Sequence, residues 1–299
     1  MTLVQVQPGV RKRDDYDHLV KRHPCYNPEA HNTCGRIHLP VSPGCNIGCR
    51  FCSRPCDKTT QRPGVSRGVL SPQAAADLVE RALALCPQLT VVGVAGPGES
   101  LASLHALAAL SLVHQRFPQL LGCLSTNGLQ LRKFVRQIAG AGVRTVSVTV
   151  NAVEPSILER INAGVMWKGR WIGGREGAKI LIREQLAGIA AAARQGLVVK
   201  TNAVLIPGIN DRHIGEIARA VSVAGAGMMN VIPLIPNHEL AQVPAPDCGM
   251  LQEARAAAEA HLPVFRHCRQ CRADACGIPG GKDLAGELYD RRLETFSHG

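Results

Sequence analysis

Short apolar runs alternate along most of the chain with longer amphipathic segments. From residue 37 onward the apolar runs follow the patterns of buried strands, and the segments between them have helical spacing. This alternation is typical of βα units around a parallel sheet. The expected strands are 37–41, 90–95, 120–125, 143–150, 197–205 and 228–235. The expected helices are 71–85, 100–116, 131–139, 176–195, 211–223 and 246–261.

Six βα units predict an α/β fold, an open, partial (βα)6 TIM-type barrel whose active site lies at the C-terminal ends of its strands. The barrel is expected to span residues 37–261, with an N-terminal extension at 1–36 and a C-terminal extension at 262–299 over the barrel mouth. Residues 151–175 contain both tryptophans and form a long insertion that is also expected to cover the mouth.

Composition and charge restrict the location and the partners. No apolar run is long enough to span a membrane, and the N-terminus lacks the apolar core of a signal peptide, which predicts a cytoplasmic protein. In the cytoplasm, twelve cysteines indicate metal binding or redox chemistry rather than disulfide bonds. The net charge of +11 is spread along the chain and only 3% of residues are aromatic, so nucleic-acid binding is not expected.

Polar residues recur where the predicted strands end. A Gly-Pro-Gly-Glu turn (96–99) follows the second strand, where glycines let a ligand approach the backbone and the carboxylate can accept from an ammonium group. A Ser-Thr-Asn-Gly turn (125–128) follows the third strand. Together these strand ends favour a nucleoside-bearing ligand, and its expected contacts are Gly98, Glu99, Thr126, Asn127, Thr149, Asn151 and Asn202.

Three cysteines, Cys45, Cys49 and Cys52, follow the first strand as a CxxxCxxC triplet. Three thiolates hold three irons of a four-iron (4Fe-4S) cluster and leave the fourth iron open, whereas structural zinc usually takes four closed ligands. The triplet resembles the cluster loop of radical S-adenosylmethionine (SAM) enzymes. That resemblance implies that SAM chelates the open iron and is cleaved by electron transfer to a 5′-deoxyadenosyl radical.

Other metal-binding residues lie far apart in the sequence. Cys25 precedes the first strand, Cys123 ends the third, and Cys268 and Cys271 form a CxxC near the C-terminus. Taken singly, each cysteine fits a packing residue, half a zinc knuckle or a redox pair. His38 on the first strand fits a hydrogen-bonded core histidine equally well.

Several sequence blocks together resemble the NifB family of nitrogenase cofactor maturases. The resemblance runs from about His23 to about Glu287 in constant order. Its blocks are HPCY (23–26), EAH (29–31), RIH (36–38), RPGV (62–65), CLSTNGL (123–129), VTVNAV (148–153), LIPGIND (205–211) and CRQCRADA (268–275).

The resemblance implies that two four-iron clusters are fused, with insertion of a SAM-derived carbide and a sulfur, into the eight-iron precursor of nitrogenase cofactor. It implies two substrate-cluster ligand sets beside the SAM cluster. The first set is Cys25, Cys268 and Cys271, and the second is His38, Cys56 and Cys123. It also implies cluster-donor scaffold and cofactor carrier proteins as partners, and an electron donor such as ferredoxin or flavodoxin.

The chain departs from the family pattern around Cys56, which lies closer to the triplet than usual. Cys34 and Cys276 stand where relatives commonly have other residues, and Cys86 and Cys248 are expected to be structural. The chain ends after the maturase region, so the product is expected to leave on a separate carrier. Three alternatives stay open: another radical SAM enzyme with auxiliary clusters, a non-catalytic iron–sulfur carrier, and a structural zinc protein.

Overall fold

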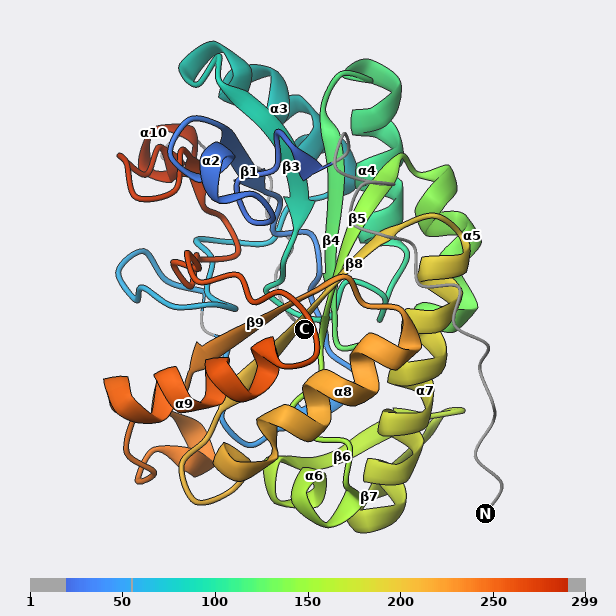
Figure 1. The fold of residues 1–299 in the computed structure, drawn as a ribbon. Helices are drawn as coiled ribbons and strands as arrows, with labels where there is room; N and C mark the ends of the chain where they lie inside the picture. The colour runs from blue at the N-terminus through green and yellow to red at the C-terminus, as the bar shows by residue number, and fades with distance from the viewer. Residues whose placement is uncertain (1–19, 55, 290–299) are drawn as a thin grey trace.

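The computed structural model describes residues 20–54 and 56–289, and its centre is a seven-stranded mixed sheet (Figure 1). The sheet order is β10-β1-β3-β4-β5-β8-β9. All neighbours are parallel except β10, which is antiparallel to β1 at the edge. The predicted partial barrel is confirmed. The strands are β1 (Gly35–His38), β3 (Leu89–Val94), β4 (Leu121–Thr126), β5 (Val143–Thr149), β8 (Val198–Leu205), β9 (Met228–Pro233) and β10 (Cys276–Gly277).

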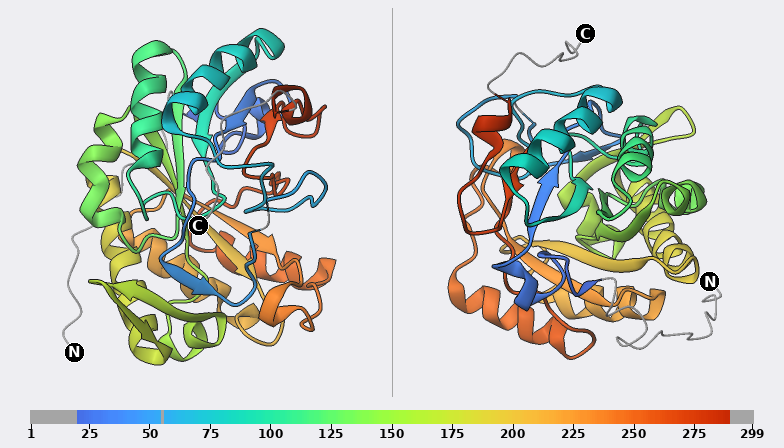
Figure 2. Two further views of the ribbon diagram at one scale, coloured as in Figure 1. Left: turned by 180° about the vertical axis from the view of Figure 1, so that it is seen from behind. Right: turned by 90° about the horizontal axis from the view of Figure 1, so that it is seen from above.

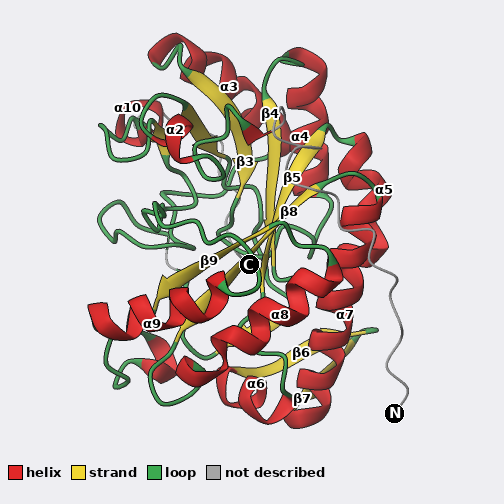
Figure 3. Cartoon of the chain, viewed as in Figure 1, coloured by secondary structure: helices red, strands yellow, loops and turns green. Residues whose placement is uncertain are grey.

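Six long helices cover the outer face of this sheet (Figures 2 and 3). They are α3 (Pro72–Leu85), α4 (His105–Arg116), α5 (Leu131–Gly140), α7 (Gly174–Arg194), α8 (Ile214–Ala224) and α9 (Cys248–Glu259). Small aliphatic residues dominate the core between sheet and helices, as the scarcity of aromatic residues indicates. None of the described helices is both long and apolar enough to cross a membrane.

The insertion at 151–175 is a helix followed by a hairpin, α6 (Pro155–Ile161), β6 (Asn162–Trp167) and β7 (Arg170–Gly173). Strand β6 pairs with β2 (Ile47–Cys49), which lies inside the cysteine loop, so the three form a second sheet. The indole of Trp171 lies against Gly48, where an added Cβ would be 3.1 Å from the ring. The insertion therefore supports the cysteine loop directly.

Strands from near both ends of the described chain pair at one edge of the sheet. Pairing of β1 with β10 places Ile37 opposite Cys276; α2 (Pro28–His31) precedes β1 in the chain and α10 (Ala285–Tyr289) follows β10. Arg272 is buried, and its guanidinium donates to Asp274 and to the carbonyl oxygen of Asp57. These bonds fix the C-terminal segment against the loop that follows the cysteine triplet.

Two helices begin at least three residues later than the sequence predicts. The segment expected to be helical from residue 100 begins its helix at His105, because the Glu99 carboxylate accepts the Leu101 amide and holds a turn there. The segment from residue 211 begins with the 3-10 turn η2 (Asp211–His213) before α8. A second 3-10 turn, η3 (His238–Leu240), follows β9.

Candidate active site

The cysteine triplet lies in the loop between β1 and α3, and its thiols are partly buried together. The amide of Cys52 donates to the carbonyl of Cys49 at 3.1 Å, which turns the loop back on itself. Burial raises the pKa of Cys49 well above its ordinary value, and the neighbouring Cys52 and Cys45 raise it further. Three neighbouring, partly buried thiols that repel one another as thiolates fit a cationic iron centre.

The Gly-Pro-Gly-Glu turn packs directly on the cysteine loop. The amides of Gly98 and Glu99 donate to the carbonyls of Ser42 and Gly44 at 2.7 and 2.8 Å. A Cβ at residue 98 would lie 2.0 Å from the Gly44 oxygen, so only glycine fits this contact. The predicted ligand-binding turn is thus rigidly attached to the predicted cluster loop.

Glu99 is buried, and burial raises the pKa of its carboxyl group although three hydrogen bonds oppose that rise. One carboxylate oxygen accepts from the Thr126 hydroxyl and the Leu101 amide. The other accepts from the Asn127 amide at 2.6 Å. One acceptor position on this second oxygen is left for a ligand.

The other residues predicted to bind SAM divide into two groups. Asn127 donates to the Asn46 side chain at 2.7 Å, and Asn151 accepts from the Val204 amide at 2.9 Å, so both mainly hold loops in place. Thr149 and Asn202, neighbours in register on β5 and β8, line an open cavity.

That cavity has a volume of about 330 Å³, which is within the range of small-molecule sites, and residues of β1, β3, β4, β5, β8 and β9 line it. Residues from both ends of the chain line it. The predicted metal-binding residues in its wall are Cys25, His38, Cys52, Cys123, Cys268 and Cys271. The last cysteine of the triplet therefore faces the same space as five of the six proposed substrate-cluster ligands.

His38 and Cys123 occupy one row of the sheet with Gly93 between them. The ring of His38 and the Cβ of Cys123 each lie 3.5 Å from the position of a Cβ at residue 93. His38 Nδ1 lies 3.0 Å from the carbonyl oxygen of Arg272, so this nitrogen carries the proton and donates. Burial lowers the pKa of His38 to about 4, which keeps the ring neutral with Nε2 free to bind iron.

Cys25 and Cys271 line the same cavity close enough for their charges to interact, and two buried cations, Arg36 and Lys200, accompany them. Burial raises the pKa of Cys25 to about 12, and Lys200 opposes that rise. The Lys200 ammonium donates to the Cys25 carbonyl at 2.8 Å and lies 4.4 Å from the Tyr26 ring centroid. Arg36 donates to the Cys271 sulfur at 3.1 Å. Buried positive charge at this wall favours thiolates and an anionic cluster.

The remaining cysteines lie elsewhere. Cys56 is exposed and its backbone forms an isolated parallel β-bridge with Ser66. It is not among the described residues that line the cavity. Cys86 and Cys276 are buried in the core beneath β1, where a Cβ on Gly35 would lie 2.9 Å from the Cys86 sulfur. Cys248 is exposed at the start of α9, and Cys34 is partly buried beside Thr33.

A zinc-type site is not seen in the described ranges, 20–54 and 56–289, because no three His, Cys, Asp or Glu side chains there close on a single ion. A four-iron cluster is several ångströms across, so its ligands need not approach one another that closely. The arrangement in the cavity wall fits such clusters.

Several side chains that line or support this site were not apparent from the sequence. Arg36 and Lys200 read as ordinary strand residues, and Gln185 reads as part of an amphipathic helix. In the structure Gln185 donates to the carbonyls of Asn127 and Thr149 at 2.8 Å and ties two strand ends together. For Arg36 and Lys200, the available signal in the sequence was a charged residue within an otherwise apolar strand.

Comparison with known proteins agrees with this geometry. Residues 39–221 match the Radical SAM superfamily. The chain is 42% identical to the FeMo cofactor biosynthesis protein NifB of Methanocaldococcus infernus, over 97% of this chain and 100% of that protein. It is 40% identical to the protein of the same description from Methanocaldococcus jannaschii, over 96% and 99% of the two chains. The counterpart from Chlorobaculum tepidum is longer, and the match covers 62% of it at 39% identity.

Solved structures share the fold. A radical SAM methyltransferase from Sphaerobacter thermophilus has a TM-score of 0.56 and 18% identity, covering 77% of this chain and 65% of that one. Streptococcus suis SuiB bound to its precursor peptide SuiA has a TM-score of 0.57 and 10% identity, covering 99% and 70%. At these identities the likeness concerns the fold alone.

Proposed function

The chain belongs to the NifB family of radical SAM enzymes and acts in FeMo cofactor biosynthesis, and from this premise we propose that it fuses two four-iron clusters into the eight-iron precursor. In this proposal a carbon from SAM becomes the central carbide and one further sulfur is added. The observation that carries it is the cavity in which Cys25, Cys271, His38 and Cys123 face Cys52.

Cys45, Cys49 and Cys52 would hold the resident four-iron cluster, which when bound with SAM supplies the electron that cleaves the sulfonium bond. Glu99 would accept from the methionyl ammonium of SAM through its second carboxylate oxygen. Gly98 brings the backbone close to that site, and the hydrogen bonds from Thr126 and Asn127 hold the Glu99 carboxylate in a fixed orientation. Thr149 and Asn202 line the cavity where the nucleoside would lie, and Asn151 anchors their strand ends.

The substrate clusters would occupy two walls of the cavity. Cys25, Cys268 and Cys271 would hold one cluster beside Arg36 and Lys200, whose charges offset the negative charge of cluster and thiolates. His38 and Cys123 would hold the other, and we keep Cys56 as a proposed third ligand that needs movement of its loop. A neutral imidazole is a weaker partner for iron than a thiolate, which suits a cluster that must move and fuse.

A role in nitrogenase cofactor assembly requires partner proteins. We propose a scaffold that donates four-iron clusters, a carrier that accepts the product, and ferredoxin or flavodoxin as the electron donor. Free thiols and exposed clusters require a reducing compartment, and for this reason we propose the cytoplasm.

Incubation with SAM that carries a radiolabelled methyl group tests this proposal. The reconstituted protein, given reductant and a sulfur source, is expected to transfer label into the iron–sulfur product. The Cys268→Ala, Cys271→Ala double variant should still cleave SAM but leave the product unlabelled. SAM cleavage by the native protein with no label in any iron–sulfur product would contradict the proposal.

A further inference from the structure

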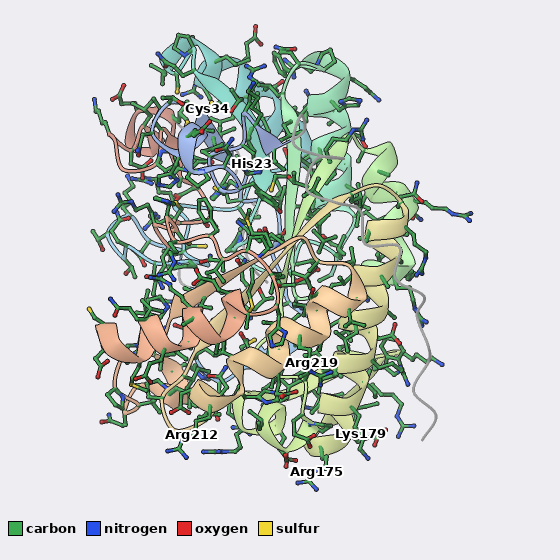
Figure 4. The ribbon with its side chains drawn as sticks, in the orientation of Figure 1. His23, Cys34, Arg175, Lys179, Arg212 and Arg219 are labelled. Carbon is green, nitrogen blue, oxygen red and sulfur yellow. The ribbon has the colours of Figure 1, made fainter. Side chains whose placement is uncertain are left out.

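His23 is a buried histidine in the cavity wall whose outer nitrogen has no partner. His23 is labelled in Figure 4. It precedes Cys25 by two residues, in the segment that leads into α2. The residue is 1% exposed, and Nε2 is buried without a hydrogen bond. His23 and Cys25 line the same cavity.

The hydrogen bond at the other ring nitrogen fixes the tautomer. The Cys25 amide donates to Nδ1 of His23 at 3.1 Å, so Nδ1 is the acceptor and the proton sits on Nε2. The ring is held there by Tyr26, whose centroid lies 4.4 Å away and whose hydroxyl is 3.2 Å from that of Ser147. His23 therefore presents an N–H donor, whereas His38 presents a lone pair.

Such a donor is costly unless something accepts from it. A buried N–H without an acceptor has lost its hydrogen bonds to water with nothing in return. Arg36 has the same need in the same wall, since its Nε is buried without a partner while its Nη2 donates to the Cys271 sulfur. Two unmatched donors beside Cys25 and Cys271 indicate that an acceptor belongs between them.

On the basis of the proposed function, we propose that His23 donates an N–H···S hydrogen bond to the substrate cluster held at Cys25, and is a positioning residue for it. The acceptor is a sulfide or the Cys25 thiolate. Because the His23 ring is bonded to the Cys25 backbone, donor and ligand keep a fixed relation as the cluster enters. Hydrogen bonds to sulfur raise the reduction potential of an iron–sulfur cluster, so His23 also stabilises its reduced form.

Two substitutions separate the two ring nitrogens. His23→Asn keeps an acceptor for the Cys25 amide but removes the outer donor, whereas His23→Gln keeps the outer donor and removes the inner acceptor. Both are made in the full chain carrying Cys49→Ala and Cys123→Ala, which leaves the Cys25 set as the one complete proposed set. The measurements are iron loss to a chelator and the potential of the cluster by redox titration.

His23→Asn should lose iron about tenfold faster than the background protein, as expected for one hydrogen bond, and its potential should fall. His23→Gln should match the background in both. Equal behaviour of His23→Asn and the background, or equal loss in both variants, would overturn the inference. If the background protein itself takes up no cluster, the proposed ligand set fails, and with it the proposed function.

Discussion

Gly93→Ala is the substitution for which the structure gives the sharpest expectation. Gly93 lies in β3 between His38 and Cys123, and a cluster bonded to both must pass directly over it. The added methyl carbon would be 3.5 Å from each neighbour, an ordinary van der Waals contact. The empty protein should therefore accept the methyl group without distortion.

The stability and the cluster content should change in opposite directions. Replacing glycine by alanine within a strand stabilises a protein by about 0.5–1 kcal/mol, so the melting temperature of the iron-free protein should rise by about 1–4 °C. The methyl group overfills the cluster site, at a cost of about 1–3 kcal/mol. That cost corresponds to about 5- to 150-fold weaker retention of the cluster at His38 and Cys123.

Anaerobic iron analysis and 5′-deoxyadenosine formation provide the assay. Gly93→Ala should lose the iron of one substrate cluster yet still cleave SAM, because the cysteine triplet is untouched. Gly140→Ala is the matched control, since a Cβ at Gly140 meets nothing within 4 Å, and it should change neither iron content nor product. Full iron content and normal product from Gly93→Ala would refute the placement of this cluster.

Three further predictions follow from the site. Cys49→Ala should abolish 5′-deoxyadenosine formation, and undiminished formation would remove the triplet from catalysis. Glu99→Ala should bind SAM about ten- to hundredfold more weakly in a calorimetric titration, through loss of one charge-assisted hydrogen bond, and unchanged affinity in a cluster-loaded variant would exclude that contact. In iron-free protein, burial lowers the pKa of His38 from 6.5 to about 4, so the unfolded state binds that proton first. Stability in urea should thus fall as pH drops from about 6.5 to about 4, and His38→Gln should flatten the slope, whereas an unchanged slope would contradict this.

The strand pattern was sufficient to predict the barrel because strands such as β3 are buried along their whole length and almost continuously apolar. The strands expected at 143–150 and 197–205 end within one residue of the observed β5 and β8. The hairpin β6–β7 was not predicted, because its pairing with β2 depends on contacts between segments more than 100 residues apart.

The sequence predicts the candidate iron ligands but not the groups that surround them. A cysteine or histidine is visible in a sequence. The role of Arg272 is not, because it depends on a backbone carbonyl that accepts from His38, a residue 234 positions away in the chain. Arg36 and Lys200 are identifiable only once the fold places their charges beside Cys25 and Cys271. Cys56 shows the reverse case, a residue assigned by family position that the structure leaves outside the cavity wall.

The central claim is that this cavity builds the precursor of nitrogenase cofactor. The most direct measurement incubates the reconstituted protein with SAM, reductant and a sulfur source, then transfers the product to cofactor-deficient nitrogenase together with the remaining assembly components. Substrate reduction should recover in a manner that depends on SAM, and this recovery should be lost in the Cys268→Ala, Cys271→Ala variant. Nitrogenase that stays inactive although SAM is cleaved and both substrate clusters are loaded would contradict the central claim.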